Sequence, residues 1–375
     1  MVRVDLSALP PVGVVPGAAS IRLHRRSLDL VSPVVASHGE HRARRVLLVE
    51  IICADGTVGW GECGAPDDPS YTGETADGAA AFLERIIGPA FAASNTVSAG
   101  QVAPLIAAVD TDARARHPMA VAAVEMAVLD AQLRAADLAF ESTFPVAARR
   151  VAVAGATLRS GPIDVVVEDA VNAVADGYSR LKVKIGPGLN ATDTIRAIRG
   201  AIDDSVMLVG DANGAYRADD VAHVASLGEL GLDIAEQPFA AHDTASHQAL
   251  VATGALRVAL DEGVRSATEA IDALANHECT DITLKPARFG YLACVDAVGR
   301  AAKHGAGVWI GGMFDTGVAR WANVRLASHP SVTLASDVGS SARYWANDLT
   351  SPIVADAGLV TTPGPRLAGL SGVPL

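Results

Sequence analysis

Residues 181–186 read Leu-Lys-Val-Lys-Ile-Gly (LKVKIG), a short β-prone run that carries two lysines one residue apart. Successive side chains of a strand point to opposite faces, so Lys182 and Lys184 share one face and the apolar residues share the other. An edge strand explains this pattern if its lysines face water and discourage aggregation. A strand inside a closed barrel explains it only if the lysines face a functional site. The rest of the chain decides between these two interpretations.

Composition excludes several classes of protein. The chain has 375 residues, of which 50% are hydrophobic, and a net charge of −12. No apolar run reaches the roughly 18 residues of a membrane span, and the N-terminus lacks a signal-peptide pattern. The negative charge argues against nucleic acid as a partner. Four cysteines form no C-x-x-C pair, so we expect a reducing, cytoplasmic location.

Short apolar strands recur from about residue 149 onward, each beginning about 23–30 residues after the last. We expect them at residues 150–157, 180–186, 206–213, 232–238, 257–262, 281–286, 307–312 and 332–337. Helix-like segments lie between them, which is typical of a parallel sheet. Eight such units favour a closed (β/α)₈-type barrel over an open sheet. Because a closed barrel has no edges, the edge-strand interpretation of LKVKIG fails.

The first 140 or so residues have a different texture. Residues 20–62 look like antiparallel strands, with a tight-turn signal at Asp55-Gly56. Residues 117–138 carry small and apolar residues at helical spacing. Strands followed by helices indicate an α+β unit. The Pro/Gly-rich C-terminal stretch is expected to wrap back over this unit.

Three acidic residues end consecutive predicted strands. Asp211, Glu236 and Asp261 are 25 residues apart, one βα repeat per step, and therefore occupy equivalent positions in the barrel. A single acid here could be a helix cap, but three at one repeat spacing would converge and repel one another. A divalent cation relieves that repulsion, and an all-oxygen ligand set favours Mg²⁺, or Mn²⁺, over zinc. Asn213 and Glu262 are expected to surround the metal ligands.

The lysines fit the same site. Lys184 ends the second strand and Lys285 the sixth, so the two face each other across the barrel mouth. A second cation nearby lowers the pKa of a lysine, and we expect Lys182 to act in this way on Lys184 or to contact a carboxylate. The chemistry that this arrangement favours is proton removal next to a carboxylate, with a metal ion stabilising the enediolate. Arg288 could reach an anionic substrate tail, and Trp60 could line the pocket or belong to the core.

The sequence resembles the enolase superfamily, and within it the muconate-lactonizing subgroup. The matching motifs are KVKIG, GDANGAY, AEQPF, LDEG, LKPARFGY, GGMFDTG, ADGTVGWGEC and RHPMAVAAVEMAVLDAQL. The resemblance implies an α/β fold in which an α+β capping domain (1–145, completed by about 345–375) covers a TIM-like (β/α)₇β barrel (146–344). It implies Mg²⁺ on the three acids, Lys184 and Lys285 as acid/base residues, and closure of the site by loops at about 30–40 and 63–73.

Two further stretches, GGMFDTGVARWAN and ASDVGSSARYWANDLTSPIV, resemble the branch of o-succinylbenzoate synthases and N-acylamino acid racemases. In that branch the synthase reaction, a dehydration in menaquinone biosynthesis, uses the second lysine of K-x-K as its base, and racemisation uses one lysine per face. The resemblance implies a small carboxylate substrate, contacted here by Gly312, Met313, Phe314 and Asp315. It also implies a homo-oligomer.

The chain departs from the family pattern at three places, and alternatives stay open. Asp315 stands where glutamate is usual, Arg366 where glycine is usual, and FESTFPVAARR replaces a glycine-rich approach to the first strand. A muconate-type cycloisomerase or a dipeptide epimerase, with Asp315 facing the substrate ammonium, would use the same machinery. An inactive barrel that only binds a carboxylate would have lost a lysine or a ligand, and all are present.

Overall fold

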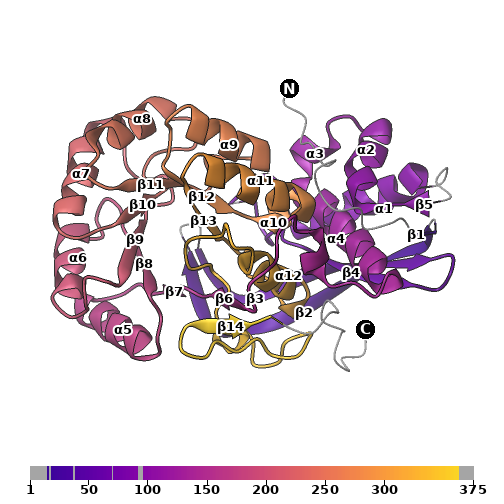
Figure 1. Ribbon diagram of the computed structural model, residues 1–375, viewed down its shortest axis with the longest axis horizontal. Helices are drawn as coiled ribbons and strands as arrows, with labels where there is room; N and C mark the ends of the chain where they lie inside the picture. Colours follow the sequence, from indigo (N-terminus) through magenta and orange to yellow (C-terminus); the bar gives the residue numbers. More distant parts are fainter. Residues whose placement is uncertain (1–14, 17, 37–38, 70, 92–95, 363–375) are drawn as a thin grey trace.

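The computed structural model describes residues 15–16, 18–36, 39–69, 71–91 and 96–362. Figure 1 shows a ring of alternating strands and helices built from the middle of the chain, beside a unit of long strands and helices built from its first 140 or so residues. The final described segment, drawn in yellow, lies against both.

The strands of the N-terminal unit are β1 (Val15–Pro16), β2 (Ala18–Ala36), β3 (Gly39–Cys53), β4 (Val58–Cys63) and β5 (Thr96–Val97). Later strands are β6 (Val151–Val153), β7 (Ala156–Thr157), β8 (Arg180–Lys184), β9 (Met207–Asp211), β10 (Ile234–Glu236), β11 (Arg257–Leu260), β12 (Asp281–Leu284), β13 (Gly307–Ile310) and β14 (Leu359–Thr361).

The helices of the N-terminal unit are α1 (Ala76–Phe91), α2 (Ala99–Val109), α3 (Ala113–Arg116) and α4 (Pro118–Ala135), followed by the 3₁₀ turn η2 (Phe140–Thr143). Those of the ring are α5 (Ile163–Ala175), α6 (Ala191–Arg199), η3 (Ala218–Asp220), α7 (Val221–Glu229), α8 (Thr244–Thr253), α9 (Ala267–Ala275), α10 (Pro286–Phe289), α11 (Tyr291–Lys303), α12 (Gly317–Ala327) and η4 (Ser341–Arg343).

The N-terminal unit is α+β, as the sequence predicts. Strands β2, β3 and β4 form an antiparallel sheet. The turn between β3 and β4 lies at the expected Asp55-Gly56: Gly56 has φ +86°, and the Asp55 carboxylate accepts a hydrogen bond from the Thr57 amide. The helix expected at 117–138 is α4, which starts with a proline, a residue favoured at the first helical position.

The ring contains a seven-stranded parallel sheet in the order β13-β12-β11-β10-β9-β8-β7. Residues 332–337, expected as the eighth strand, form only an isolated bridge between Ala154 and Ser336. Their amides nevertheless bond both neighbours, Leu334 to the carbonyl of Val308 on β13 and Ser336 to that of Val153. This segment therefore closes the barrel without adopting regular strand geometry.

The first predicted strand, residues 150–157, is divided between two sheets. Its beginning, β6, pairs antiparallel with β14, whereas its end, β7, pairs parallel with β8. Gly155 lies at the break, where a Cβ atom would approach the Arg180 Nε to 2.8 Å. The close passage of Arg180, which begins β8, accounts for a glycine there.

The described part of the C-terminal segment contacts both units. Trp345 forms an antiparallel bridge with Leu30 of β2, and β14 pairs with β6 at the start of the barrel. The proposed domain boundaries remain predictions. Residues 363–375, including Arg366, lie outside the described residues. Within the described ranges, no helix has the length and apolar character needed to cross a membrane.

Two contacts join the capping sheet to helices, one in its own unit and one in the barrel. Gly61 on β4 lies so close to α4 that an added Cβ atom would collide with the carbonyl oxygen of Ala123. Glu62, the next residue, is 1% exposed and accepts hydrogen bonds from the amides of Thr316 and Ala319 at the start of α12. The capping sheet thus caps a barrel helix through a buried carboxylate.

We predict that Gly61→Ala lowers the free energy of unfolding by roughly 1–3 kcal/mol, because overpacking at this contact forces β4 and α4 apart. Thermal or urea unfolding followed by circular dichroism would measure the change. Gly88→Ala is the matched control: a Cβ at this exposed helical position meets nothing within 4 Å, so this change should leave stability equal or raise it by up to about 1 kcal/mol. Equal destabilisation by both changes would contradict the packing argument.

Candidate active site

A cavity of about 660 Å³ opens at the carboxyl ends of the barrel strands, and both parts of the chain line it. Leu30, Ser32 and Arg44 come from the capping sheet, and Gly64 and Tyr71 from the loop that follows β4. Portions of both expected closing loops therefore reach the cavity. The chain has four lysines, and three of them line this cavity; the fourth, Lys303, is exposed at the end of α11.

Strand register brings the first charged residues together. In the parallel pairing, Lys184 of β8 lies beside Asp211 of β9, and Asp211 lies beside Glu236 of β10. Asp261 directly follows β11, the next strand of the sheet. The three predicted metal ligands thus lie on or directly after adjacent strands, as their 25-residue spacing predicts.

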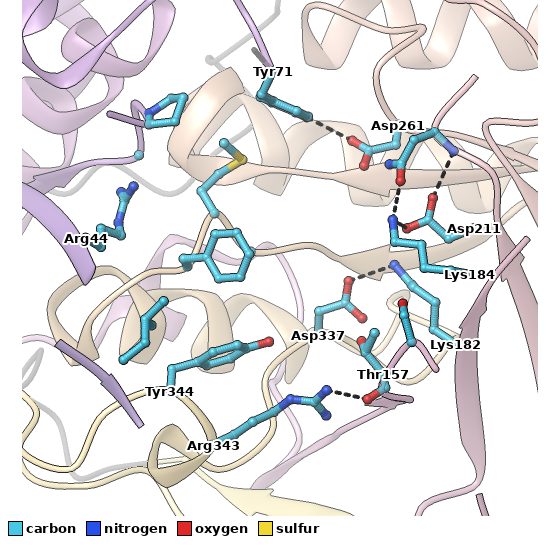
Figure 2. Close-up of a pocket in the computed structure, with 18 of the residues that line it drawn as sticks. Arg44, Tyr71, Thr157, Lys182, Lys184, Asp211, Asp261, Asp337, Arg343 and Tyr344 are labelled. Carbon is cyan, nitrogen blue, oxygen red and sulfur yellow. Dashed lines mark hydrogen bonds and ion pairs between the residues drawn. The ribbon is translucent and has the colours of Figure 1, made fainter. Parts of the chain in front are cut away.

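Both lysines of β8 are ion-paired (Figure 2). The Nζ atom of Lys182 lies 2.6 Å from the Glu236 Oε2 and 3.1 Å from the Asp337 Oδ2. The Nζ atom of Lys184 lies 2.8 Å from the Asp211 Oδ2 and also donates to the Asn213 Oδ1. The two side chains therefore share a face, as the alternation of LKVKIG indicates.

Lys285 approaches from the other side. It follows β12, four positions from β8 in the sheet. Its Nζ atom lies 2.8 Å from the Asp261 Oδ2 and donates to the Tyr71 hydroxyl at 2.9 Å. That hydroxyl donates in turn to the Asp261 Oδ1 at 3.2 Å. A capping-loop tyrosine therefore joins the lysine and the carboxylate.

Neighbouring carboxylates raise the pKa values of two of the cavity lysines, Lys182 and Lys285. Burial by itself lowers the pKa of Lys182, but the attraction of Asp337 and Glu236 outweighs burial and raises the pKa above its ordinary value. Burial likewise opposes protonation of Lys285, yet Asp261 and other neighbours hold its pKa well above the ordinary value. Carboxylates, rather than neighbouring cations, dominate the field at these two amines.

The acids suit a hard cation by their chemistry. Asp211, Glu236 and Asp261 are all at least nine-tenths buried and offer only oxygen atoms. Burial raises the pKa of Glu236, and the charges of Asp211 and Asp261 raise it further although Lys182 opposes them. Such mutual repulsion is what a divalent cation relieves. In the conformation that the described residues adopt, each acid turns to a lysine, and no group of three or more His, Cys, Asp or Glu side chains among them is arranged to hold a metal.

The residues expected around the metal ligands lie beside them. The Asn213 amide nitrogen donates to the Asp211 Oδ1 at 3.2 Å, and its side chain donates to the Glu262 Oε1 at 2.8 Å. The other oxygen of Glu262, Oε2, is buried and has no hydrogen-bond partner among the described residues. This leaves one carboxylate oxygen near the ligand set with unused capacity.

Of the expected substrate contacts, Gly312, Met313 and Phe314 line the cavity, but Asp315 does not. Its side chain is 1% exposed, and its Oδ2 accepts hydrogen bonds from the Met313 amide and from the Asn323 side chain, both at 3.0 Å. The loop after β13 thus turns this carboxylate toward Met313 and Asn323, and the expected substrate contact of Asp315 stays a prediction. Neither Arg288 nor Trp60 lines the cavity.

Two residues of the site escaped the sequence analysis. Asp337 binds both Lys182 and Arg180 and ends the predicted strand 332–337, so the rule that identified the other acids would have identified it. Tyr71 lies in a loop whose path no periodicity predicts. Its contacts with Lys285 and Asp261 could not be foreseen.

The fold and this site are those of a barrel enzyme with a capping domain, and comparison with known proteins agrees. Residues 19–142 match the mandelate racemase/muconate lactonizing enzyme N-terminal domain family, and residues 165–371 match the enolase C-terminal domain-like family. The chain belongs to the enolase superfamily, and it is an enzyme of that superfamily.

Individual relatives define the branch. The chain is 36% identical to an N-succinylamino acid racemase of an Amycolatopsis species, over 95% of each chain. It is 31% identical to the o-succinylbenzoate synthase of Bacillus subtilis, over 88% of each. A crystal structure described as an unknown member of the enolase superfamily, from Enterococcus faecalis, superposes with a TM-score of 0.87 at 28% identity, over 96% of each chain. The chain thus lies among relatives of both names.

A buried glutamate fixes the loop that carries Tyr71. The Glu74 side chain is 2% exposed and accepts hydrogen bonds from the amides of Met119 and Ala120, at 2.8 and 2.9 Å, in the first turn of α4. Burial raises its pKa to about 7 despite these bonds. The folded protein therefore binds this proton more tightly than the unfolded chain does, so the contribution of Glu74 to stability falls as pH rises from about 4.5 to about 7.

We predict that Glu74→Gln, which cannot ionise, gains stability relative to the unchanged protein as pH rises from 5 to 8. The gain should be roughly 1–3 kcal/mol, because one pKa unit corresponds to about 1.4 kcal/mol. Urea unfolding of both proteins at several pH values measures it, since the other titrating groups cancel in the difference. A difference that stays constant across this range would show that Glu74 has an ordinary pKa.

Proposed function

We propose that this enzyme removes the proton alpha to the carboxylate of a small organic acid and stabilises the resulting enediolate. The observation that carries the proposal is the placement of Lys184 and Lys285. Their strands lie four positions apart in the ring, and both amines reach one cavity beside a cluster of buried carboxylates.

Each lysine has a role in this chemistry. In a racemisation, one of Lys184 and Lys285 accepts the α-proton as a neutral amine while the other, as an ammonium, delivers a proton to the opposite face. In a dehydration, Lys184 accepts the α-proton and, now an ammonium, returns a proton to the leaving hydroxyl, which departs as water. Lys182, held by Glu236 and Asp337, stays an ammonium and faces the substrate carboxylate.

The ligands of a divalent cation, Mg²⁺ or alternatively Mn²⁺, would be Asp211, Glu236 and Asp261, with Asn213 and Glu262 orienting them. When bound, such a cation would supply positive charge to the carboxylate oxygens of the substrate as the α-proton leaves. In this structure each of the three acids pairs with one lysine.

Within this chemistry we propose o-succinylbenzoate synthase activity, N-acylamino acid racemase activity, or both. The named relatives support this choice. A dipeptide epimerase is less well supported, because the acid expected to face the substrate ammonium, Asp315, lies outside the cavity. The complete set of lysines and acids argues against an inactive barrel.

The oligomeric state, the ligand, the pathway and the cellular location are also proposals. We propose a homo-oligomer whose ligand is a small carboxylate, with no nucleic acid bound, given the net charge of −12. The synthase reaction would place the enzyme in menaquinone biosynthesis. Four cysteines that are all buried and free support a reducing, cytoplasmic location.

We predict that the purified protein with Mg²⁺ exchanges the α-proton of an N-acylamino acid in D₂O, as followed by ¹H NMR, or dehydrates the o-succinylbenzoate precursor, as followed by ultraviolet absorbance. Lys184→Ala and Lys285→Ala should each lower racemisation by about 100- to 10,000-fold, because positioned acid–base groups contribute that much.

Lys303→Ala is the matched control and should keep the rate within about twofold, because this lysine is exposed and outside the cavity. Loss of dehydration in Lys184→Ala alone would identify a one-base lyase. Exchange that survives both cavity substitutions, or no reaction with any substrate, would refute the proposed function.

A further inference from the structure

The two proposed bases are held by different parts of the chain. The Nζ atom of Lys184 bonds to Asp211 and Asn213, which both belong to the barrel. Within the described ranges, no side chain of the N-terminal unit bonds to this amine. Lys285 donates instead to the hydroxyl of Tyr71, in the loop between β4 and α1, at 2.9 Å. Of these two amines, only that of Lys285 therefore depends on the N-terminal unit for its position.

The Tyr71 hydroxyl fixes the direction of the Lys285 amine. A lysine ammonium has three N–H donors, and Tyr71 and Asp261 accept two of them. The hydroxyl gives its own proton to the Asp261 Oδ1 at 3.2 Å, so its oxygen acts as an acceptor toward the amine (Figure 2). One position on the nitrogen is then left for the cavity, which Lys285 lines. That position is a third N–H in the ammonium and the lone pair in the neutral amine, the two forms that acid–base chemistry requires.

Helices of the N-terminal unit also hold the segment that follows Lys285. Arg114 in α3 donates to the carbonyl oxygen of Phe289 at 2.9 Å. Glu125 in α4 is 7% exposed and accepts a hydrogen bond from the Leu292 amide at 3.0 Å. The tyrosine loop is bound to the start of the same helix, α4. The chain segments on both sides of the bond between tyrosine and lysine are therefore fixed to one helix, which keeps the distance between them constant.

We infer that Tyr71 is a positioning residue for Lys285 and acts on proton transfer at one face of the substrate only. Lys184 keeps its position at the other face through barrel residues alone. The inference rests on the proposed function, in which Lys184 and Lys285 serve opposite faces. An enzyme built in this way has two half-reactions that respond differently to the loss of a single hydroxyl.

Loss of the α-proton from each enantiomer of N-succinyl-valine measures the two faces separately. The assay follows the ¹H NMR signal in D₂O with Mg²⁺. The base on one face takes the proton of one enantiomer, and the signal is lost whichever lysine then returns a deuteron. Lys285→Ala identifies the enantiomer that Lys285 serves, because its proton loss should fall by about 100- to 10,000-fold.

Tyr71→Phe keeps the ring, whose centre lies 4.7 Å from the Lys285 Nζ, and removes the hydroxyl. We expect proton loss from the Lys285 enantiomer to fall by about 10- to 100-fold, because a misplacement of about 1 Å costs that much. Proton loss from the other enantiomer should stay within about threefold. Tyr216→Phe is the matched control, since it removes a buried hydroxyl that lies outside the cavity and has no partner among the described residues. Both rates should stay within about twofold in this variant.

The ratio between the enantiomers separates positioning from other effects. A merely structural role of Tyr71, or a weaker hold on Mg²⁺ through its contact with Asp261, would slow both enantiomers alike and overturn the inference. Unchanged rates in Tyr71→Phe would also overturn it. Either result leaves the proposed function standing, because the unchanged enzyme still exchanges both protons.

Proton loss from neither enantiomer in the unchanged enzyme would overturn the inference as well, since Lys285 would then have no proton to take. The dehydration assay decides the proposed function in that case. Dehydration would keep it as a one-base lyase, and the absence of both reactions would refute it.

Discussion

The parallel register of β8, β9 and β10 is the constraint on which the site depends. It places Lys184 beside Asp211 and Asp211 beside Glu236, so these three charged side chains lie close together. Buried charges are costly unless they are paired. The structure meets this requirement by giving each proposed ligand acid a lysine of its own, from β8 or from the residue after β12. The three lysines that pair with these acids are also the three that line the cavity.

This pairing couples the acids to the bases. The carboxylates raise the pKa values of Lys182 and Lys285, which stabilises the ammonium forms. A catalytic base must be a neutral amine. The ion pair with Asp261 stabilises the protonated form of Lys285, which cannot accept a proton. Any positive charge that is brought to the acids weakens their hold on the ammonium groups and makes the neutral amine easier to form. Binding of a cation to the acids and the proton affinity of the lysines are therefore coupled.

The sequence predicts the part of the site that follows strand periodicity. Repeat spacing located the acids and lysines because the ends of successive parallel strands meet at one edge. The same rule extends to Asp337. It fails after β13, where a loop directs Asp315 into the protein through bonds to Met313 and Asn323. The rule also does not reach Tyr71, because this residue lies in a loop. Close packing of Arg180 against Gly155 accounts for the division of the first predicted strand. The direction of a side chain in a loop depends on contacts far away in the sequence.

Substrate specificity must therefore come from the parts of the cavity wall that lie outside the repeating strand ends. The strand ends supply charges that act on any α-proton next to a carboxylate, and they cannot distinguish one acyl group from another. The remaining cavity wall comes from segments that tertiary contacts hold in place: the Tyr71 loop by Glu74, and α12 by Glu62. Trp345, beside Arg343 and Tyr344, bridges to Leu30 of the capping sheet. Because the capping domain holds all of these segments, a change in its packing would alter substrate choice before it altered the chemistry.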